Sequence, residues 1–290
     1  MKSYGKLSLS LIAFLLVFSH CQADDPLDAL IKQAAKGHAE TRVKLGNMYR
    51  DGEGVEKNYA EAVKWYQKAA ELGDADAQRC LGGMYYQGLG VKQSYTEAMK
   101  WYQKAAELGD HKSQYNVGMM YSNGLGVKKS YAEAIKWYKR AADKGESSAQ
   151  FNLGVMYSKG QGVKQDYAEA MKWYNRAAEQ GDTDALVNLG FMYYKGHGVE
   201  QNFFKAARYY KKAADLGNVD AQVELGSMYH DGQGVEKDYV KAVAYWTVAL
   251  TLGNDKVANH NLLVGLTEMT TEEYSEGRRQ AAIILSQIPK

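Results

Sequence analysis

Proline is almost absent from this sequence, with only 2 among 290 residues, Pro26 and Pro289. Because proline interrupts helices more strongly than any other residue, the long stretch between these two positions lacks the main helix breaker. Cysteine is equally scarce, with 2 residues. This scarcity excludes the small secreted folds that depend on several disulfides.

A large excess of charge of one sign is also missing. The 36 Lys and Arg residues face 34 Asp and Glu residues, and without Lys2 and Lys6 the two signs would balance. No dense cluster of basic residues stands out. We therefore expect no nucleic-acid partner and no binding to an anionic membrane surface.

Long hydrophobic runs are limited to Leu7–Phe18, which is too short to span a bilayer as a helix. Lys2 and Lys6 precede this run, and the small residue Ala23 ends the polar stretch after it. This order is typical of a secretory signal peptide, so we expect residues 1–23 to be removed and the protein to be exported, into the periplasm or beyond the cell. No later run predicts an integral membrane segment.

An alternative interpretation makes Cys21 the lipid-modified first residue of a lipoprotein. His20 disfavours it, since a small residue is expected before such a cysteine. After cleavage at Ala23 the remaining cysteine, Cys80, has no partner for an internal disulfide. We expect it to be an ordinary thiol, with a redox role or an intermolecular disulfide as the alternative.

The 29 glycines are what the chain has in abundance, and they recur at a fixed interval of 36 residues. Gly46, Gly52, Gly54 and Gly73 each have counterparts in six successive copies. Such periodicity is the sign of a repeat protein. We place the copies at 39–74, 75–110, 111–146, 147–182, 183–218 and 219–254.

Each copy is predicted to form two helices. In the first copy, Thr41, Leu45, Met48 and Tyr49 share one helical face. Gly46 lies inside that helix at a cost of about 1 kcal/mol relative to alanine, so we expect it to permit close approach of a neighbouring helix. The helix is predicted to end at Gly52, where a left-handed residue is favoured.

The second helix of each copy begins with a strong N-cap. The capping positions are Asn58, Ser94, Ser130, Asp166, Asn202 and Asp238. A glutamate three residues later, such as Glu61, predicts a reciprocal capping box in the first four copies. In the last two copies it is replaced by Lys205 and Lys241, so we expect incomplete boxes there.

Helix pairs of this kind bury their apolar faces only by stacking on one another. We therefore predict an all-α fold, a right-handed α/α superhelical solenoid. Residues 24–38 form an N-terminal capping helix in this prediction, and residues 255–290 form C-terminal capping helices. The last of these is predicted to begin with a capping box at Thr270–Glu273 and to run through Gln287.

The repeat resembles a known family. Its pattern, Ala-Gln-x-x-Leu-Gly-x-Met-Tyr-x-x-Gly-x-Gly-Val followed by Tyr-x-Glu-Ala-x-x-Trp-Tyr-x-x-Ala-Ala-x-x-Gly, is similar to the Sel-1-like repeat, a longer relative of the tetratricopeptide repeat. Ala77–Gly109 and Ala149–Gly181 match best. The resemblance implies an α/α superhelix whose first helices line a concave surface, and a role as a protein–protein adaptor.

A disulfide-stapled branch of that family has been connected with penicillin binding and hydrolysis. This chain lacks the cysteine pair of that branch. The Ser-x-x-Lys motif of serine β-lactamases occurs only as Ser3 to Lys6, inside the predicted signal. We therefore expect no enzymatic activity, and a cell-wall-fragment or penicillin-binding protein is the alternative function.

Cofactor and metal motifs are also missing from the sequence. The recurring Gly-x-Gly is predicted to join two helices, so we interpret it as structural and not as a nucleotide-binding loop. The histidines downstream of the signal occupy unrelated repeat positions, so we expect no metal site and no cofactor. The tryptophans Trp65, Trp101, Trp137 and Trp173 recur strictly, and we interpret them as packing residues and not as ligand contacts.

Partner recognition is predicted on the face of the first helix that the packing residues leave free. In the first copy this face carries Glu40, Val43, Asn47 and Arg50. The same slots in the middle copies are apolar or aromatic. The predicted groove residues are Tyr86, Tyr115, Met119, Phe151, Val155, Val187, Phe191 and Tyr194. The competing interpretation is that Phe151 and Phe191 pack against adjacent helices and expose little.

These expectations combine into one functional hypothesis. The protein is predicted to be an exported, non-enzymatic adaptor that binds another envelope or host protein in this groove. A lumenal adaptor of a eukaryotic secretory compartment is a further alternative, although the chain ends without a KDEL-type signal.

Overall fold

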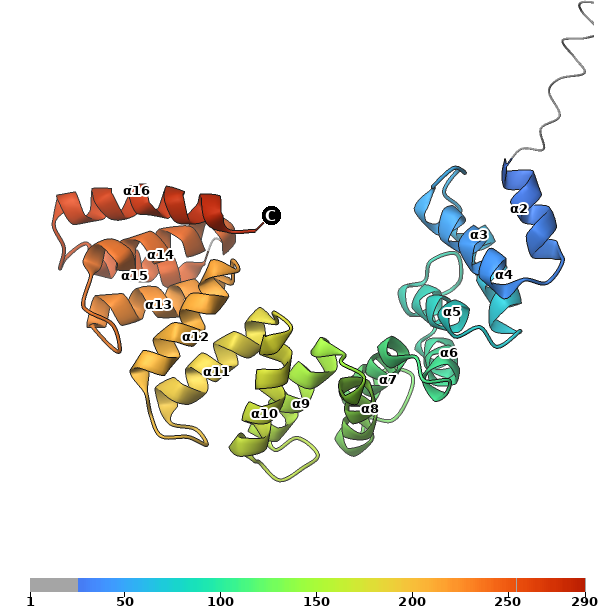
Figure 1. The fold of residues 1–290 in the computed structure, drawn as a ribbon, viewed down its shortest axis with the longest axis horizontal. Coiled ribbons are helices and arrows are strands. Elements are labelled where there is room, and N and C mark those ends of the chain that lie inside the picture. Colours follow the sequence, from blue (N-terminus) through green and yellow to red (C-terminus); the bar gives the residue numbers. More distant parts are fainter. Residues whose placement is uncertain (1–25, 254, 290) are drawn as a thin grey trace, which may run out of the picture. The chain divides into compact units, whose positions relative to one another are not determined.

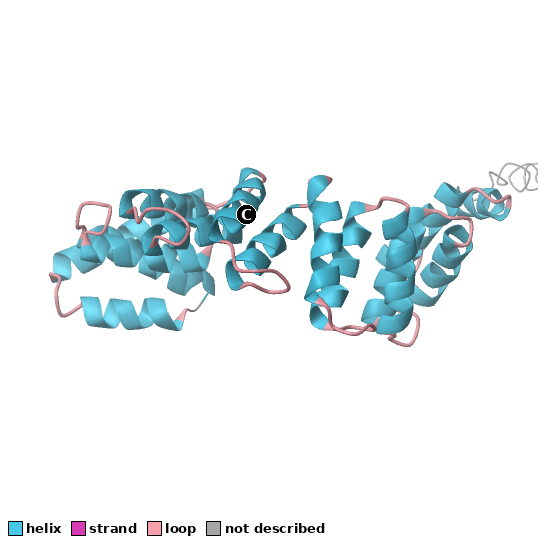
Figure 2. Cartoon of the chain, turned by 90° about the horizontal axis from the view of Figure 1, so that it is seen from below, coloured by secondary structure: helices cyan, strands magenta, loops and turns pink. Residues whose placement is uncertain are grey.

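The computed structural model describes residues 26–253 and 255–289, and every regular element among them is an α-helix (Figures 1 and 2). The predicted signal peptide and Cys21 lie outside the described residues. The helices are α2 (Pro26–Ala35), α3 (Ala39–Asp51), α4 (Tyr59–Ala70), α5 (Ala75–Gln87), α6 (Tyr95–Glu107), α7 (His111–Asn123), α8 (Tyr131–Asp143), α9 (Ser147–Lys159), α10 (Tyr167–Glu179), α11 (Thr183–Lys195), α12 (Phe203–Asp215), α13 (Val219–Asp231), α14 (Tyr239–Gly253), α15 (Lys256–Gly265) and α16 (Thr271–Gln287).

The chain divides into two compact units. The first holds the described residues up to Ser113 together with Leu125–Lys128, and the second holds Gln114–Gly124 and the residues from Lys129 onward. Within each unit, most helices pack against the next along the chain, as α3 does with α4 and α4 with α5. The fold is therefore an α/α solenoid of stacked helix pairs, as predicted.

The predicted N-caps are confirmed at the start of the second helices. Asn58 Oδ1 accepts the backbone N–H of Glu61 at 3.1 Å, and Asp166 Oδ1 accepts that of Glu169 at 2.9 Å. The Glu61 side chain does not make the predicted reciprocal bond to the N-cap. Its Oε1 accepts from Lys64 Nζ at 2.6 Å instead. A complete capping box closes the start of α16, where Thr270 and Glu273 bond each other in both directions, as predicted.

The predicted ends of the first helices are also confirmed. Gly52 adopts a left-handed conformation with φ 78°, and its N–H donates to Met48 O at 2.8 Å. This arrangement satisfies a carbonyl that the end of α3 would otherwise leave without a partner.

The glycine inside each first helix permits the close helix contact that the sequence predicts. A β-carbon on Gly46 would lie 2.5 Å from the ring of Tyr66 on α4, and Tyr66 is fully buried. The same contact recurs at Gly82, Gly118, Gly154 and Gly190 with a tyrosine of the second helix, and at Gly226 with Trp246.

The second glycine of each loop joins neighbouring repeats from the second repeat onward. A β-carbon on Gly90 would lie 2.4 Å from the backbone of Tyr59, at the start of the preceding second helix. Gly126 approaches Tyr95 in the same way. This loop therefore fixes how closely successive helix pairs stack.

The last helices close one end of the second unit. α16 packs along α14, and α15 contacts both α13 and α14 (Figure 1). Gly277 of α16 allows this, because a β-carbon there would lie 2.6 Å from Val243. The final helix thus begins at the predicted capping box and runs through Gln287, as predicted.

Candidate functional site

The predicted groove residues are distributed over both units. Tyr86 belongs to the first unit, and the other seven belong to the second. Phe191 is the exposed member, with 43% of its surface accessible, and the remaining seven are half-buried. The predicted face therefore has access to solvent, but most of its side chains also make internal contacts.

Several of these internal contacts are specific. The Phe151 ring lies 5.9 Å from the ring of Tyr174, and the Tyr115 ring lies 5.8 Å from that of Tyr138. Tyr194 Oη donates to Gln233 Oε1 at 2.8 Å, which ties α11 to the loop of the next repeat. For these residues, packing between helices accounts for part of the aromatic character of the face.

Val187 and Phe191 line a cavity of about 480 Å³ between α11, α13 and α15. Its other lining residues are Asn188, Tyr210, Asp220, Val223, Glu224, Asp255 and Val257. We call this the repeat-five cavity. Tyr210 and Val223 are buried at its floor, whereas Phe191 and Val257 are exposed at its rim.

The sequence prediction missed the carboxylates of this cavity. Asp220 and Glu224 lie on α13, and Asp255 is the N-cap residue of α15. The sequence indicated one of these carboxylates, because Glu224 stands in the repeat slot that Cys80 and Asn188 occupy in other repeats.

The environment of Glu224 disfavours its charged form. Much of its side chain is accessible, but the surrounding protein atoms displace water from the carboxyl group and so raise its pKa. Nearby Asp220 raises the pKa further, while Lys195 opposes the shift. A cation delivered into the repeat-five cavity would relieve this cost.

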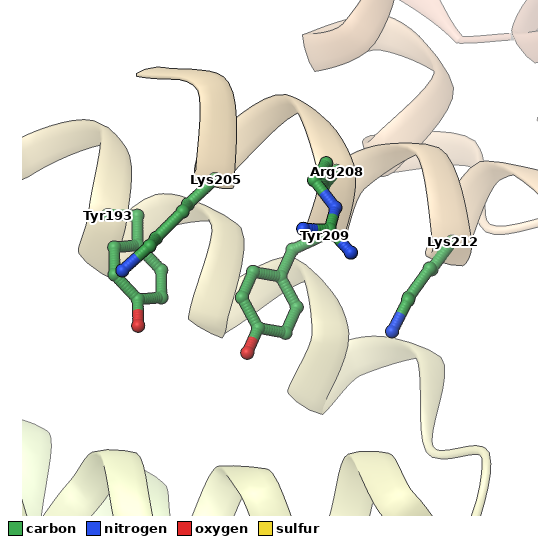
Figure 3. A pocket seen from close by; sticks show the side chains of 5 residues that line it. All are labelled: Tyr193, Lys205, Arg208, Tyr209 and Lys212. Carbon is green, nitrogen blue, oxygen red and sulfur yellow. The ribbon is translucent and has the colours of Figure 1, made fainter. Parts of the chain in front are cut away.

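A second feature lies on α12. Lys205, Arg208 and Lys212 project from one side of this helix and surround two tyrosines, Tyr193 and Tyr209 (Figure 3). The expectation that the chain has no basic cluster is therefore wrong at this place. The spacing of three and four residues was visible in the sequence, and it places the three side chains on one helical face.

The recurring tryptophans pack as predicted. Trp137 and Trp173 are buried, and Trp65 and Trp101 are half-buried. Each carries a cation over its ring from the residue three positions on, at 4.4 Å for Lys68, 4.1 Å for Lys104, 4.6 Å for Arg140 and 4.7 Å for Arg176. These cation–π contacts stabilise the second-helix face of the first four repeats.

Cys80 is a free, half-buried thiol on α5. Burial raises its pKa, although Arg79 and Arg50 oppose the shift. Burial likewise raises the pKa of Tyr138 to about 12, so this phenol stays neutral at physiological pH.

Within the described ranges, His, Cys, Asp and Glu side chains form no group of three or more that could hold a metal ion.

Across residues 26–253 and 255–289, no helix has the length and apolar character needed to cross a membrane.

Comparison with known proteins identifies the family. The Sel1 repeat matches the chain six times, at residues 39–74, 75–110, 111–146, 147–182, 183–218 and 219–254. The chain belongs to the Sel1 repeat family. Sel1 repeats mediate protein interactions and typically form scaffolds without catalytic activity.

Two solved structures have folds similar to that of this chain. The crystal structure of c5321, described as a protective antigen present in uropathogenic Escherichia coli strains, shares 36% sequence identity with a TM-score of 0.80 over 90% of this chain. This chain spans 56% of the length of that one. A Sel1 repeat protein from Oxalobacter formigenes shares 39% identity, with a TM-score of 0.69 over 81% of this chain and 92% of that chain. No curated protein sequence matches the chain.

Proposed function

We propose that this protein is an exported, non-enzymatic adaptor that binds an extended segment of another protein at the repeat-five cavity. In this proposal residues 1–23 direct export, residues 24–38 and 255–290 close the ends of the array, and the six repeats carry the binding surface. The observation that supports it most is Phe191, a large aromatic side chain that is 43% exposed at the rim of a cavity with a buried apolar floor.

The chemistry of the cavity indicates which residue types the partner segment would carry. Val187, Phe191 and Val257 suit an apolar side chain, while Asp220 and Glu224 suit a lysine or arginine beside it. Because the environment of Glu224 penalises its negative charge, a cation bound there gains more than it would at a fully hydrated carboxylate. The proposed partner segment therefore contains an apolar residue next to a basic one.

Selection from a displayed peptide library on the full chain tests this proposal. We expect the enriched peptides to pair an apolar residue with Lys or Arg, and to bind Phe191→Ser about tenfold more weakly. Leu108→Ser is the control, because Leu108 is also a large exposed apolar residue, at 60%, but lies outside this cavity. Equal binding to the wild-type chain and Phe191→Ser would exclude the repeat-five cavity as the site.

Phe191 is a cleaner probe than Tyr194. Tyr194 donates a hydrogen bond to Gln233 and packs its ring 5.1 Å from Phe203, so its truncation would also loosen the contact between repeats. Glu224→Gln serves as the second variant, since it removes the charge and keeps the shape. We expect it to weaken the basic peptides selectively and to leave the melting temperature unchanged or slightly higher, because it removes a charge that the cavity disfavours.

Export is proposed from the sequence, and the relative described as a protective antigen supports it. Terminal sequencing of the protein recovered from its producing cell tests this part. An N-terminus at Asp24 is expected, whereas a lipid-modified Cys21 would establish the lipoprotein alternative.

A nitrocefin hydrolysis assay and binding of a fluorescent penicillin test the cell-wall alternative, and we expect neither signal.

A further inference from the structure

The second helix of the fifth repeat departs from a charge pattern that the first four repeats share. In those repeats a glutamate in the first turn pairs with the lysine three residues on. The Nζ to carboxylate distances are 2.6 Å for Lys64–Glu61, 3.7 Å for Lys100–Glu97, 2.6 Å for Lys136–Glu133 and 2.9 Å for Lys172–Glu169. In the fifth repeat the corresponding residues are Lys205 and Arg208. A neutral pair has thus become two positive charges.

The position of Lys205 makes this change unfavourable for the helix itself. Lys205 lies in the first turn of α12, where the helix dipole favours a negative charge. Its backbone N–H is held by Asn202 Oδ1 at 2.8 Å, so the helix is capped without any help from the lysine side chain. The N-cap of α12 therefore does not depend on a cation at this place.

The side chains of this face enclose a small pocket. The rings of Tyr193 and Tyr209 are stacked 5.6 Å apart at 12°, and Lys205 Nζ lies 5.1 Å from the centre of the Tyr193 ring. Lys212 Nζ lies 6.0 Å from the Tyr209 ring, farther than the corresponding cations of the first four repeats. In Figure 3 both tyrosine hydroxyls point to the same side, and the three cations border the rings. The pocket has a volume of about 160 Å³.

The three cations are exposed and form no ion pair with any described residue. The neighbouring Lys211 differs, since its Nζ bonds the carboxylate of Asp215. The combination of three cations is confined to the fifth repeat. The fourth repeat has Glu169 in the slot of Lys205, and the sixth keeps a lysine there, Lys241, which pairs with Asp238, but has Ala244 and Val248 in the other two slots.

We propose that Lys205, Arg208 and Lys212, with Tyr193 and Tyr209, bind the carboxylate of an acidic residue in a partner protein. Arg208 supplies a fork of N–H donors that matches a carboxylate, and the lysines supply charge from either side. A single repeat of positive charge suits one or two carboxylates, whereas nucleic acid or a membrane surface calls for a more extended basic face.

An adjoining hollow indicates what accompanies the acidic residue. It shares Arg208 and Lys212 with the pocket and is lined also by Phe204, Leu225 and Val235. Phe204 is 62% exposed there. An apolar side chain next to the acidic one would cover this surface. The preferred segment is therefore acidic and apolar, which is opposite in charge to the segment proposed for the repeat-five cavity, and the two proposals stand independently.

Fluorescence anisotropy with the full chain and a labelled peptide containing Glu-Glu-Leu-Glu-Glu tests the proposal. Lys205→Glu restores the charge pattern of the first four repeats, and we expect it and Arg208→Ala each to weaken binding at least about tenfold. Lys92→Glu is the charge-matched control, because Lys92 is exposed in a loop of the first unit. Its affinity should stay at the wild-type value. Binding should also weaken between about 50 mM and 300 mM NaCl.

Several results would overturn the proposal. One is a folded Lys205→Glu variant, with an unchanged melting temperature or a higher one, that binds the peptide as tightly as the wild-type chain. Another is equal weakening by Lys205→Glu and Lys92→Glu, which would indicate a response to net charge alone. Equal affinity for a peptide with glutamine in place of glutamate would also exclude a carboxylate site. Vesicles containing phosphatidylglycerol that bind the chain through Lys205, when the peptide does not bind, would make a membrane the occupant instead.

Discussion

Gly154 of α9 lies directly against the ring of Tyr174 on α10. A β-carbon at position 154 would lie 2.5 Å from two ring carbons of Tyr174, whereas carbon atoms in contact prefer about 3.5–4.0 Å. Tyr174 is only 1% exposed and is held by a hydroxyl contact of 3.3 Å with Ser158, so its ring has little freedom to move. This glycine is therefore required by the packing of the two helices within the repeat.

The first prediction concerns this contact. Gly154→Ala should lower the free energy of unfolding by about 1–3 kcal/mol, because the added methyl group overpacks the interface between α9 and α10. The loss should appear even though alanine favours a helix by about 1 kcal/mol over glycine. Urea denaturation followed by circular dichroism measures the change.

Gly83→Ala is the matched control for this prediction. Gly83 also lies inside a first helix, but a β-carbon there would meet only the Tyr102 hydroxyl at 3.5 Å, an ordinary contact. This variant should be as stable as the wild-type chain or more stable by up to about 1 kcal/mol. Equal destabilisation of both variants would show that the ring contact is not the cause.

The role of Gly154 and its counterparts could be predicted from sequence, because a glycine kept inside a helix at every repeat calls for a close neighbour. The role of Gly90 could not be predicted in the same way. Its contact with the backbone of Tyr59 depends on how one helix pair stacks on the preceding one. The 36-residue period identifies the repeating unit, but the distance between units follows from side-chain packing.

The candidate site shows a similar limit. Helical geometry placed Phe191 and Val155 in the same slot and left open whether such residues face solvent or pack. Phe191 is exposed, whereas Val155 packs against buried residues of α10 and α11. The repeat-five cavity combines α11 with α13 and α15, and only tertiary structure brings Asp255 near Phe191. The cluster of Lys205, Arg208 and Lys212 lies on one helix, so its spacing alone was sufficient to find it.

The second prediction concerns acid stability. Partial burial works against ionisation of Asp238, but the backbone N–H and the ammonium group of Lys241 outweigh it and hold the pKa of Asp238 below its usual value. A depressed carboxyl pKa in the folded state contributes stability above the unfolded pKa of about 3.9, and this contribution is lost as the pH falls through the folded value. Asp238→Asn keeps an N-cap but does not titrate.

The wild-type chain should therefore be more stable than Asp238→Asn near neutral pH, and the difference should shrink as the pH falls below about 4. Denaturant titrations of both proteins at several pH values measure this difference. Because the other carboxyl groups are common to both proteins, their effects cancel in the comparison. A difference that stays constant down to about pH 3 would mean that the Asp238 charge does not stabilise α14.

The third prediction concerns the reactivity of Cys80. Burial raises the pKa of its thiol and so reduces the thiolate, which is the nucleophilic form. In a Cys21→Ser background, iodoacetamide should alkylate Cys80 at least about tenfold more slowly in the folded chain than in urea at the same pH. Mass spectrometry follows the reaction. Equal rates in the two states would show that Arg79 and Arg50 offset burial and make the thiol reactive.

The last prediction concerns the energetic cost of the cationic face on α12. Lys205→Glu should raise the free energy of unfolding by about 0.3–1 kcal/mol, because it places a negative charge at the helix N-terminus and gives Arg208 a partner three residues away. Glu169→Lys makes the opposite change in the fourth repeat and should lower stability by a similar amount, since it removes the partner of Lys172. Both effects should diminish in high salt.

If Lys205→Glu instead destabilises the folded chain, Lys205 contributes to the fold, and its departure from the pattern of the first four repeats no longer points to a ligand. A more stable variant that has lost peptide binding would mean that the fifth repeat gives up stability for recognition.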